Sequence, residues 1–65
     1  MNMSGTELVR IARRLYGGHG WQTKLSEALQ VDTSTIRRWV ASDVVPGPAA
    51  MAIKLMDYLS VEDDG

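Results

Sequence analysis

Apolar residues recur with the spacing of an α-helix along most of the chain, beginning close to its N-terminus. The first apolar stripe consists of Leu8, Ile11, Ala12 and Leu15. This i, i+3, i+4, i+7 spacing predicts a helix with one buried face. Ser4 followed three residues later by Glu7 has the pattern of a capping box, so the helix should begin near Gly5. Gly17 and Gly18 predict its end, because glycine adopts the left-handed C-terminal cap without steric cost.

Two shorter apolar stripes follow and predict two further helices. The first begins after Gly20 and consists of Trp21, Leu25, Ala28 and Leu29. The second consists of Ile36, Trp39 and Val40. Asp32 is placed to be the N-cap of the helix that contains Ile36, and Val31 before it can act as a hydrophobic staple. We expect Trp39 to pack in the core or at its boundary.

A fourth helix is predicted after a loop at residues 42–47. Pro48 suits the first turn of a helix, where its missing N–H group is not needed. The helix should run to about Leu59, and residues 61–65 are expected to be a frayed acidic end. No segment favours a strand. The sequence therefore predicts one small all-α, four-helix domain over residues 1–60.

The fourth helix is apolar on two sides. One side can close the core and consists of Ala49, Ala52, Ile53 and Met56. The opposite side contains Met51, Leu55 and Tyr58, with Leu59 at its edge. A helix that is apolar on both faces should be buried on both, and so short a chain has too few residues to cover the second face. We expect a homodimer with these four residues in its twofold interface; the alternative is that the acidic tail folds over them.

Length and composition narrow the classes of function. The 65 residues include no cysteine and one histidine, which excludes a disulfide framework and a thiolate zinc site. No nucleophile–base pair or paired carboxylates can be assembled, so we expect neither an enzyme nor a bound metal or cofactor. No apolar run approaches the roughly 18 residues of a membrane span, and the N-terminus does not resemble a signal peptide. We expect a cytoplasmic protein without a membrane partner.

Charge is distributed unevenly along the chain. The net charge is −1, yet residues 10–38 contain six Lys or Arg and two Asp or Glu, which gives 6 − 2 = +4. Three acidic residues, Glu62, Asp63 and Asp64, stand close together at the C-terminus. The basic middle of the chain leaves binding to nucleic acid open despite the negative total.

Residues 22–40, QTKLSEALQVDTSTIRRWV, resemble the helix-turn-helix of Cro-type DNA-binding regulators, the lambdoid phage repressor-like or XRE-like family. The family pattern is matched at Gln22, Ser26, Gln30, Ile36 and Trp39. The resemblance implies a domain of the lambda-repressor-like type, with its helix-turn-helix at about residues 21–41. The family usually has glycine where Gln30 stands. A left-handed backbone costs other residues about 1–2 kcal/mol, so the turn is either strained or built with a different geometry.

The third predicted helix presents a short polar face opposite Ile36. At 100° per residue, Ser34, Arg38 and Ala41 point outward together. Such a face fits a major groove, where arginine can bind guanine through two hydrogen bonds. The resemblance implies base contacts at Thr33, Ser34 and Arg38, and a phosphate contact at Gln22.

Further candidate phosphate contacts surround these positions. They are Thr23, Lys24, Arg37 and Arg14, and His19 is a further candidate contact to the DNA backbone. The start of the second helix suits phosphate because its N–H groups and the positive end of its dipole face outward.

The expected function is that of a sequence-specific regulator of transcription that binds double-stranded DNA. The resemblance favours a repressor, or autorepressor, of a phage or mobile-element operon. A dimer would read an inverted repeat with its two third helices about 34 Å apart. The alternative is a protein-interaction module on the same fold, such as an antirepressor or an antitoxin, which the acidic tail and net charge of −1 keep open.

Overall fold

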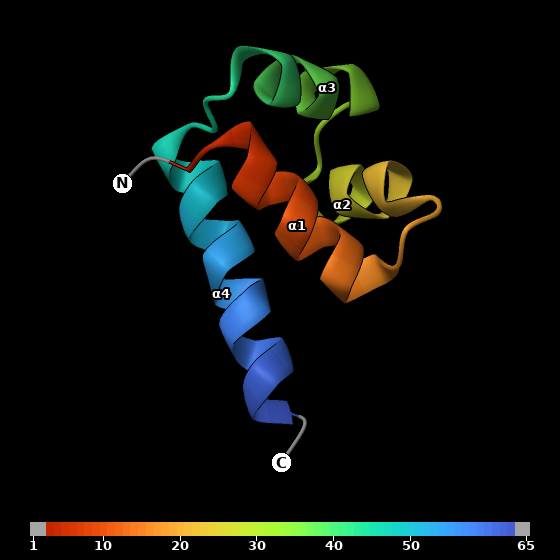
Figure 1. Cartoon of the computed structure of the whole chain (residues 1–65), viewed down its shortest axis with the longest axis vertical. Helices are drawn as coiled ribbons and strands as arrows, with labels where there is room; N and C mark the ends of the chain where they lie inside the picture. Colours follow the sequence, from red (N-terminus) through yellow and green to blue (C-terminus); the bar gives the residue numbers. More distant parts are fainter. Residues whose placement is uncertain (1–2, 64–65) are drawn as a thin grey trace.

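Four α-helices build the protein in the computed structural model, which describes residues 3–63 and the side chains of residues 3–60 (Figure 1). They are α1 (Gly5–Tyr16), α2 (Trp21–Leu29), α3 (Thr33–Ser42) and α4 (Gly47–Asp63). Helix α1 contacts each of the other three and is therefore the centre of the fold. The described part of the chain has no strand, so the predicted all-α, four-helix architecture is confirmed.

The beginning and the end of α1 agree with the sequence pattern. The hydroxyl of Ser4 accepts a hydrogen bond from the N–H of Glu7 at 3.0 Å. The carboxylate of Glu7 lies 3.8 Å from the guanidinium of Arg10, so it pairs with that side chain. At the other end Gly17 has a φ of 93°, and its N–H donates to the carbonyl of Arg13 at 2.7 Å. Glycine at this position lets the chain leave the helix in a conformation that other residues rarely adopt.

A residue far away in the sequence also caps α1. The Oδ1 atom of Asp43 accepts a hydrogen bond from the N–H of Gly5 at 2.9 Å, and lies 3.4 Å from the nitrogen of Thr6. This contact requires α1 to approach α3 closely. A Cβ atom on Gly5 would lie 2.9 Å from the Cα and the carbonyl oxygen of Val40, so the close approach depends on glycine. The sequence predicted residues 42–47 only as a connecting loop.

Replacing Asp43 with alanine should lower the free energy of unfolding by about 1–2 kcal/mol, because two N–H groups lose their acceptor. The matched control is Asp43→Asn, which keeps a side-chain oxygen and tolerates the left-handed backbone that Asp43 adopts at φ 62°. Urea denaturation of the two variants measures the difference. Equal stability of the alanine and asparagine variants would show that the cap contributes nothing.

The core lies between α1 and the other helices. Its buried apolar residues are Met3, Leu8, Ile11, Ala12, Leu25, Ile36, Val45, Ala50 and Ile53. Most of them lie on the predicted stripes. Trp39 is half-buried and packs against this core, as expected for a boundary residue.

The buried face of α2 differs from the prediction at one position. Ala28 was expected on the apolar stripe, but it is exposed. The reason is that Ser26 is buried beside Leu25, with only 5% of its surface exposed, which moves the centre of the buried arc toward Ser26. At 100° per residue, Ala28 then falls outside this arc.

Two buried residues lie outside the helices. The N–H of Val45 donates to the carbonyl of Met3 at 2.8 Å, and this pair is an isolated antiparallel bridge. Both side chains are buried, which fastens the segment before α1 to the segment before α4. Neither position belongs to a periodic pattern, so their burial could not be predicted from the sequence.

Helix α4 is longer than predicted. It contains Pro48 in its first turn, as expected, but it continues to Asp63 and does not end near Leu59. No glycine or proline stands between these two residues to stop it. The prediction of a frayed end is therefore wrong for residues 61–63, and the same continuation prevents those residues from folding back over α4. The remainder of the predicted tail, residues 64–65, lies outside the described residues. Among the described helices, none combines the length and the apolar character that crossing a membrane requires.

Candidate functional site

Helices α2 and α3 are joined by a tight connection at residues 30–32. Gln30 has a left-handed backbone, with φ 58° and ψ 45°. Its N–H donates to the carbonyl of Glu27 at 3.3 Å, and the N–H of Val31 donates to the carbonyl of Ser26 at 3.0 Å. Of the two geometries that the sequence left open, the strained left-handed turn is the one found. This turn sets the direction in which the chain leaves α2 and enters α3.

Replacing Gln30 with glycine should raise the free energy of unfolding by about 0.5–1 kcal/mol. Glycine removes the strain of the left-handed backbone, although its greater freedom in the unfolded chain offsets part of the gain. The comparison variant is Gln30→Val, which should lower stability because a β-branched residue is strained further at this φ. Urea denaturation gives both values, and a glycine variant less stable than the parent would contradict the prediction.

The small side chain of Ser26 is buried on α2. Its hydroxyl donates a hydrogen bond to the carbonyl of Thr23 at 2.8 Å, so its polar group is satisfied within its own helix. A small side chain buried at this position lets a neighbouring helix pack closely against α2.

Helix α3 has one buried and one exposed face. Ile36 is fully buried, while Trp39 and Val40 are half-buried beside it. The exposed residues on the other side are Ser34, Arg37, Arg38 and Ala41, and Thr33 at the first position is half-buried. No described residue therefore covers the predicted outward face of α3.

Asp32 occupies the N-cap position of α3, but its side chain does not cap the helix. Its backbone carbonyl accepts hydrogen bonds from the N–H groups of Thr35 at 3.0 Å and Ile36 at 3.3 Å, and its carboxylate makes no capping bond. The predicted side-chain cap is thus wrong. The carboxylate of Asp32 is exposed, so water can solvate it in place of a capping hydrogen bond.

The first turn of α2 carries three of the candidate phosphate contacts. Thr23 and Lys24 are exposed and Gln22 is half-buried. Gly20 is the N-cap, in a left-handed conformation at φ 77°, and no side chain caps this end. The N–H groups of the turn therefore lack a side-chain acceptor and suit an external anion.

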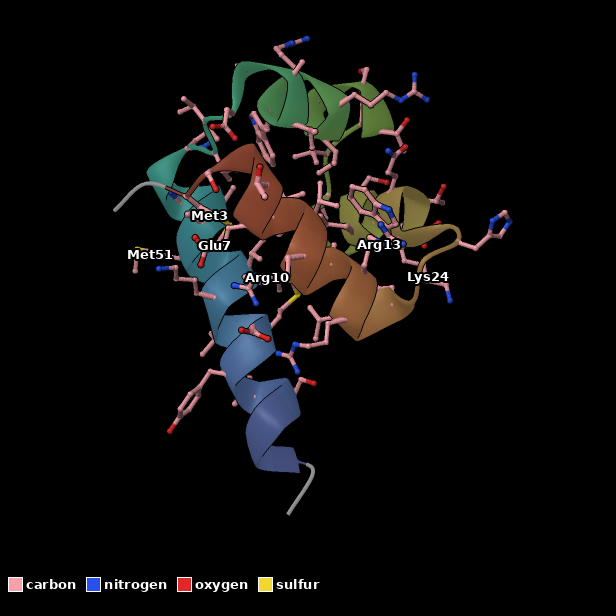
Figure 2. All side chains as sticks on the ribbon, viewed as in Figure 1. Met3, Glu7, Arg10, Arg13, Lys24 and Met51 are labelled. Atoms are coloured by element: carbon pink, nitrogen blue, oxygen red, sulfur yellow. The ribbon has the colours of Figure 1, made fainter. Side chains whose placement is uncertain are left out.

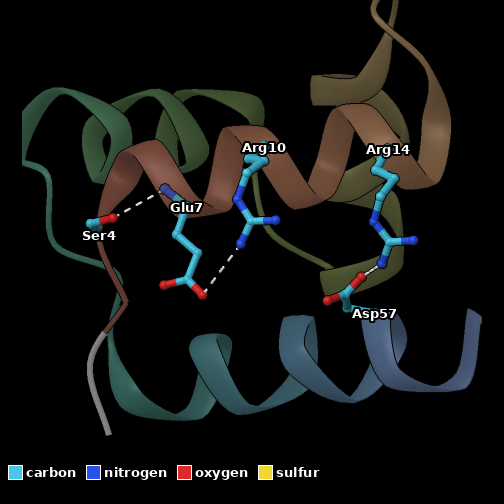
Figure 3. A network of polar contacts seen from close by, with 5 residues as sticks. All are labelled: Ser4, Glu7, Arg10, Arg14 and Asp57. Atoms are coloured by element: carbon cyan, nitrogen blue, oxygen red, sulfur yellow. Dashed lines mark hydrogen bonds and ion pairs between the residues drawn. The ribbon is translucent and has the colours of Figure 1, made fainter. Parts of the chain in front are cut away.

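Arg14, another of the candidate phosphate contacts, lies on α1. Its guanidinium forms an ion pair with the carboxylate of Asp57 on α4 (Figure 3). Asp57 is half-buried, with 28% of its side chain exposed, whereas Arg14 is exposed. A phosphate contact by Arg14 would have to replace this ion pair.

The second apolar side of α4 is exposed. The exposed fractions are 63% for Met51, 57% for Leu55, 61% for Tyr58 and 53% for Leu59. Figure 2 shows Met51 pointing away from α1, on the outer side of α4. We refer to these four residues as the α4 stripe. Side chains this large and this exposed on one helix face are typical of a surface that another molecule covers.

An apolar groove adjoins the α4 stripe. It is lined by Leu29, Val31, Trp39, Pro46, Pro48, Ala49 and Ala52. On α4, Pro48 and Ala52 stand three residues before Met51 and Leu55, a spacing that makes them neighbours on the helix surface, so the groove and the stripe form one apolar surface.

Among the described side chains, those of residues 3–60, no group of three or more histidine or acidic residues is placed to hold a metal ion. A comparison of the chain with models of known protein families finds no match, and comparisons with curated proteins and with solved structures find none either. Function has to be inferred from the residues and their arrangement.

Proposed function

We propose that the protein binds double-stranded DNA in a sequence-specific manner, with α2 and α3 as a helix-turn-helix of the lambda-repressor-like type and α3 in the major groove. The observation that carries this proposal is the exposed outer face of α3. Ser34, Arg38 and Ala41 are exposed, opposite the buried Ile36. The short side chains of Ser34 and Ala41, one turn before and one turn after Arg38, let the helix approach the bases closely. Arg38 can then donate two hydrogen bonds to O6 and N7 of a guanine.

The DNA backbone would be held on both sides of this face. Gln22, Thr23 and Lys24 present the start of α2 to one strand, and Arg37 extends from the flank of α3. Thr33, at the first position of α3, stands where the helix would meet the base edges. Phosphate contacts of this kind fix the orientation of the helix, whereas the base contacts provide the specificity.

The proposed active form is a homodimer that uses the α4 stripe. A dimer matches an inverted repeat and doubles the phosphate contacts, which a protein with a net charge of −1 needs for affinity. A bound dimer would regulate transcription in the cytoplasm by occupying a promoter, most simply that of its own operon, and excluding the polymerase.

A fluorescence titration tests the proposal. Labelled duplexes, one with the DNA upstream of the reading frame and one with a scrambled sequence, are titrated at about 50 mM and about 200 mM salt. We expect the upstream duplex to bind more tightly. With Lys24 and Arg37 from each protomer on phosphate, the affinity should fall roughly 100-fold over this range. Binding that is absent or insensitive to salt would contradict the proposal.

The second candidate function is that of a protein-interaction module. The apolar surface formed by the α4 stripe and its groove favours it, because that surface could bind a different protein. The same titration separates the two functions, since a module of this kind would show no salt-dependent preference for one duplex.

A further inference from the structure

Helix α1 carries three arginines whose environments differ. Arg10 lies 3.8 Å from the carboxylate of Glu7, and Arg14 is paired with Asp57 (Figure 3). Arg13 is exposed, and among the described side chains it forms no ion pair. Of these three cations, Arg13 alone has no described acidic partner to offset its charge.

Arg13 also lies next to the segment that leads into α2. Its Nη2 and Nε atoms are 3.3 and 3.7 Å from the position that a Cβ atom would take at Gly18. Figure 2 shows Arg13 and Lys24 on the α2 side of the molecule, with Met51 on the opposite side. The guanidinium therefore lies beside Gly18, in the loop that leads to the first turn of α2, where Gln22, Thr23 and Lys24 are proposed to hold the DNA backbone.

The surroundings of Arg13 leave room for a ligand. A shallow depression between α1 and α3 is lined by Gly5, Thr6, Val9, Arg10, Arg13 and Val40. Its lining includes no acidic side chain. Helix α1 runs from Gly5 toward the loop before α2 (Figure 1). Arg13 therefore lies at the end of the depression that is nearer to α2.

We propose that Arg13 is a phosphate contact, and that it takes the role the sequence assigned to Arg14. The inference rests on the proposed binding of DNA. A guanidinium can donate two parallel hydrogen bonds to phosphate oxygens, so an unpaired arginine at this place adds both charge and orientation. Arg14 would first have to give up its contact with Asp57, whereas Arg13 has no such contact to break.

The experiment compares Arg13→Ala with two matched controls on the same helix, Arg10→Ala and Arg14→Ala. Each variant is titrated with the upstream and the scrambled duplexes at several salt concentrations. For Arg13→Ala we expect the affinity for both duplexes to fall alike, by roughly tenfold or more, and the slope of log K against log salt to decrease by about 1 per protomer. Arg13→Lys should keep the slope, because the charge remains. The two control variants should keep the slope of the parent.

The outcomes separate this inference from the proposed function. If the parent protein binds duplex DNA with a steep dependence on salt and Arg13→Ala has the same slope, the assignment of Arg13 is wrong and the proposed function stands. A reduced slope in Arg14→Ala alone would overturn the assignment in favour of Arg14. If the parent shows no salt-dependent binding, both proposals fail. Urea denaturation of Arg13→Ala should match the parent, since the side chain is exposed.

Discussion

Replacing Arg38 with alanine should remove most of the discrimination between the preferred duplex and a scrambled one. A bidentate contact of arginine with guanine provides about 1–3 kcal/mol of discrimination, which corresponds to roughly 5- to 150-fold in affinity for each half-site. The affinity for the scrambled duplex should fall much less, because only one cation near the backbone is lost. The free energy of unfolding should change by less than about 0.5 kcal/mol, since Arg38 is exposed. Fluorescence titration and urea denaturation measure these effects.

The control for this prediction is Arg38→Lys. Lysine retains the positive charge but lacks the planar fork that binds guanine through two hydrogen bonds. This variant should keep the salt dependence of the parent and lose its discrimination. An unchanged preference in Arg38→Ala would remove Arg38 from the proposed base-reading face.

Replacing Leu55 with glutamate should convert the proposed homodimer to a monomer. Leu55 is 57% exposed in the middle of the α4 stripe, and near a twofold axis the substitution would bring two carboxylates together in an apolar contact. Sedimentation should then give the 7.2 kDa mass of one chain. The affinity for an inverted repeat should fall by roughly 100-fold or more, because the second half-site is no longer bound by a linked partner.

A control on the same helix tests whether the position matters. Ser60 is exposed on α4 and does not belong to the α4 stripe, so Ser60→Glu should leave the dimer intact. If Leu55→Glu still sediments as a dimer, the interface lies elsewhere on the protein. Monomeric parent protein at all concentrations would argue against the dimer itself.

The sequence predicted the parts of the fold that follow from local periodicity. The buried side of α1 and the burial of Ile36 were expected, and so were the exposed positions of Ser34 and Arg38. The spacing of apolar residues determines which side of a helix faces the core, and it thereby determines the outward side as well. Glycine signals also marked the end of α1 correctly.

Features that depend on contacts between distant residues could not be predicted. Asp43 caps α1 across 38 positions of sequence, and the pairing of Arg14 with Asp57 depends on how α1 and α4 pack. The sequence does not show which arginines of α1 are paired with an acid, so it predicted a phosphate contact at Arg14 and not at Arg13. The acidic residues at the end of α4 favour a frayed end in the sequence, yet no residue there breaks a helix, and α4 continues to Asp63.

The most direct test of the proposed function is an NMR titration of the ¹⁵N-labelled protein with its preferred duplex. If the outer face of α3 enters the major groove, the largest changes in amide chemical shift should occur at residues 33–41 and at residues 20–24. The amides of the α4 stripe should change little when DNA is added. Changes confined to α4, with residues 33–41 unaffected at saturation, would contradict the proposal that α3 reads DNA.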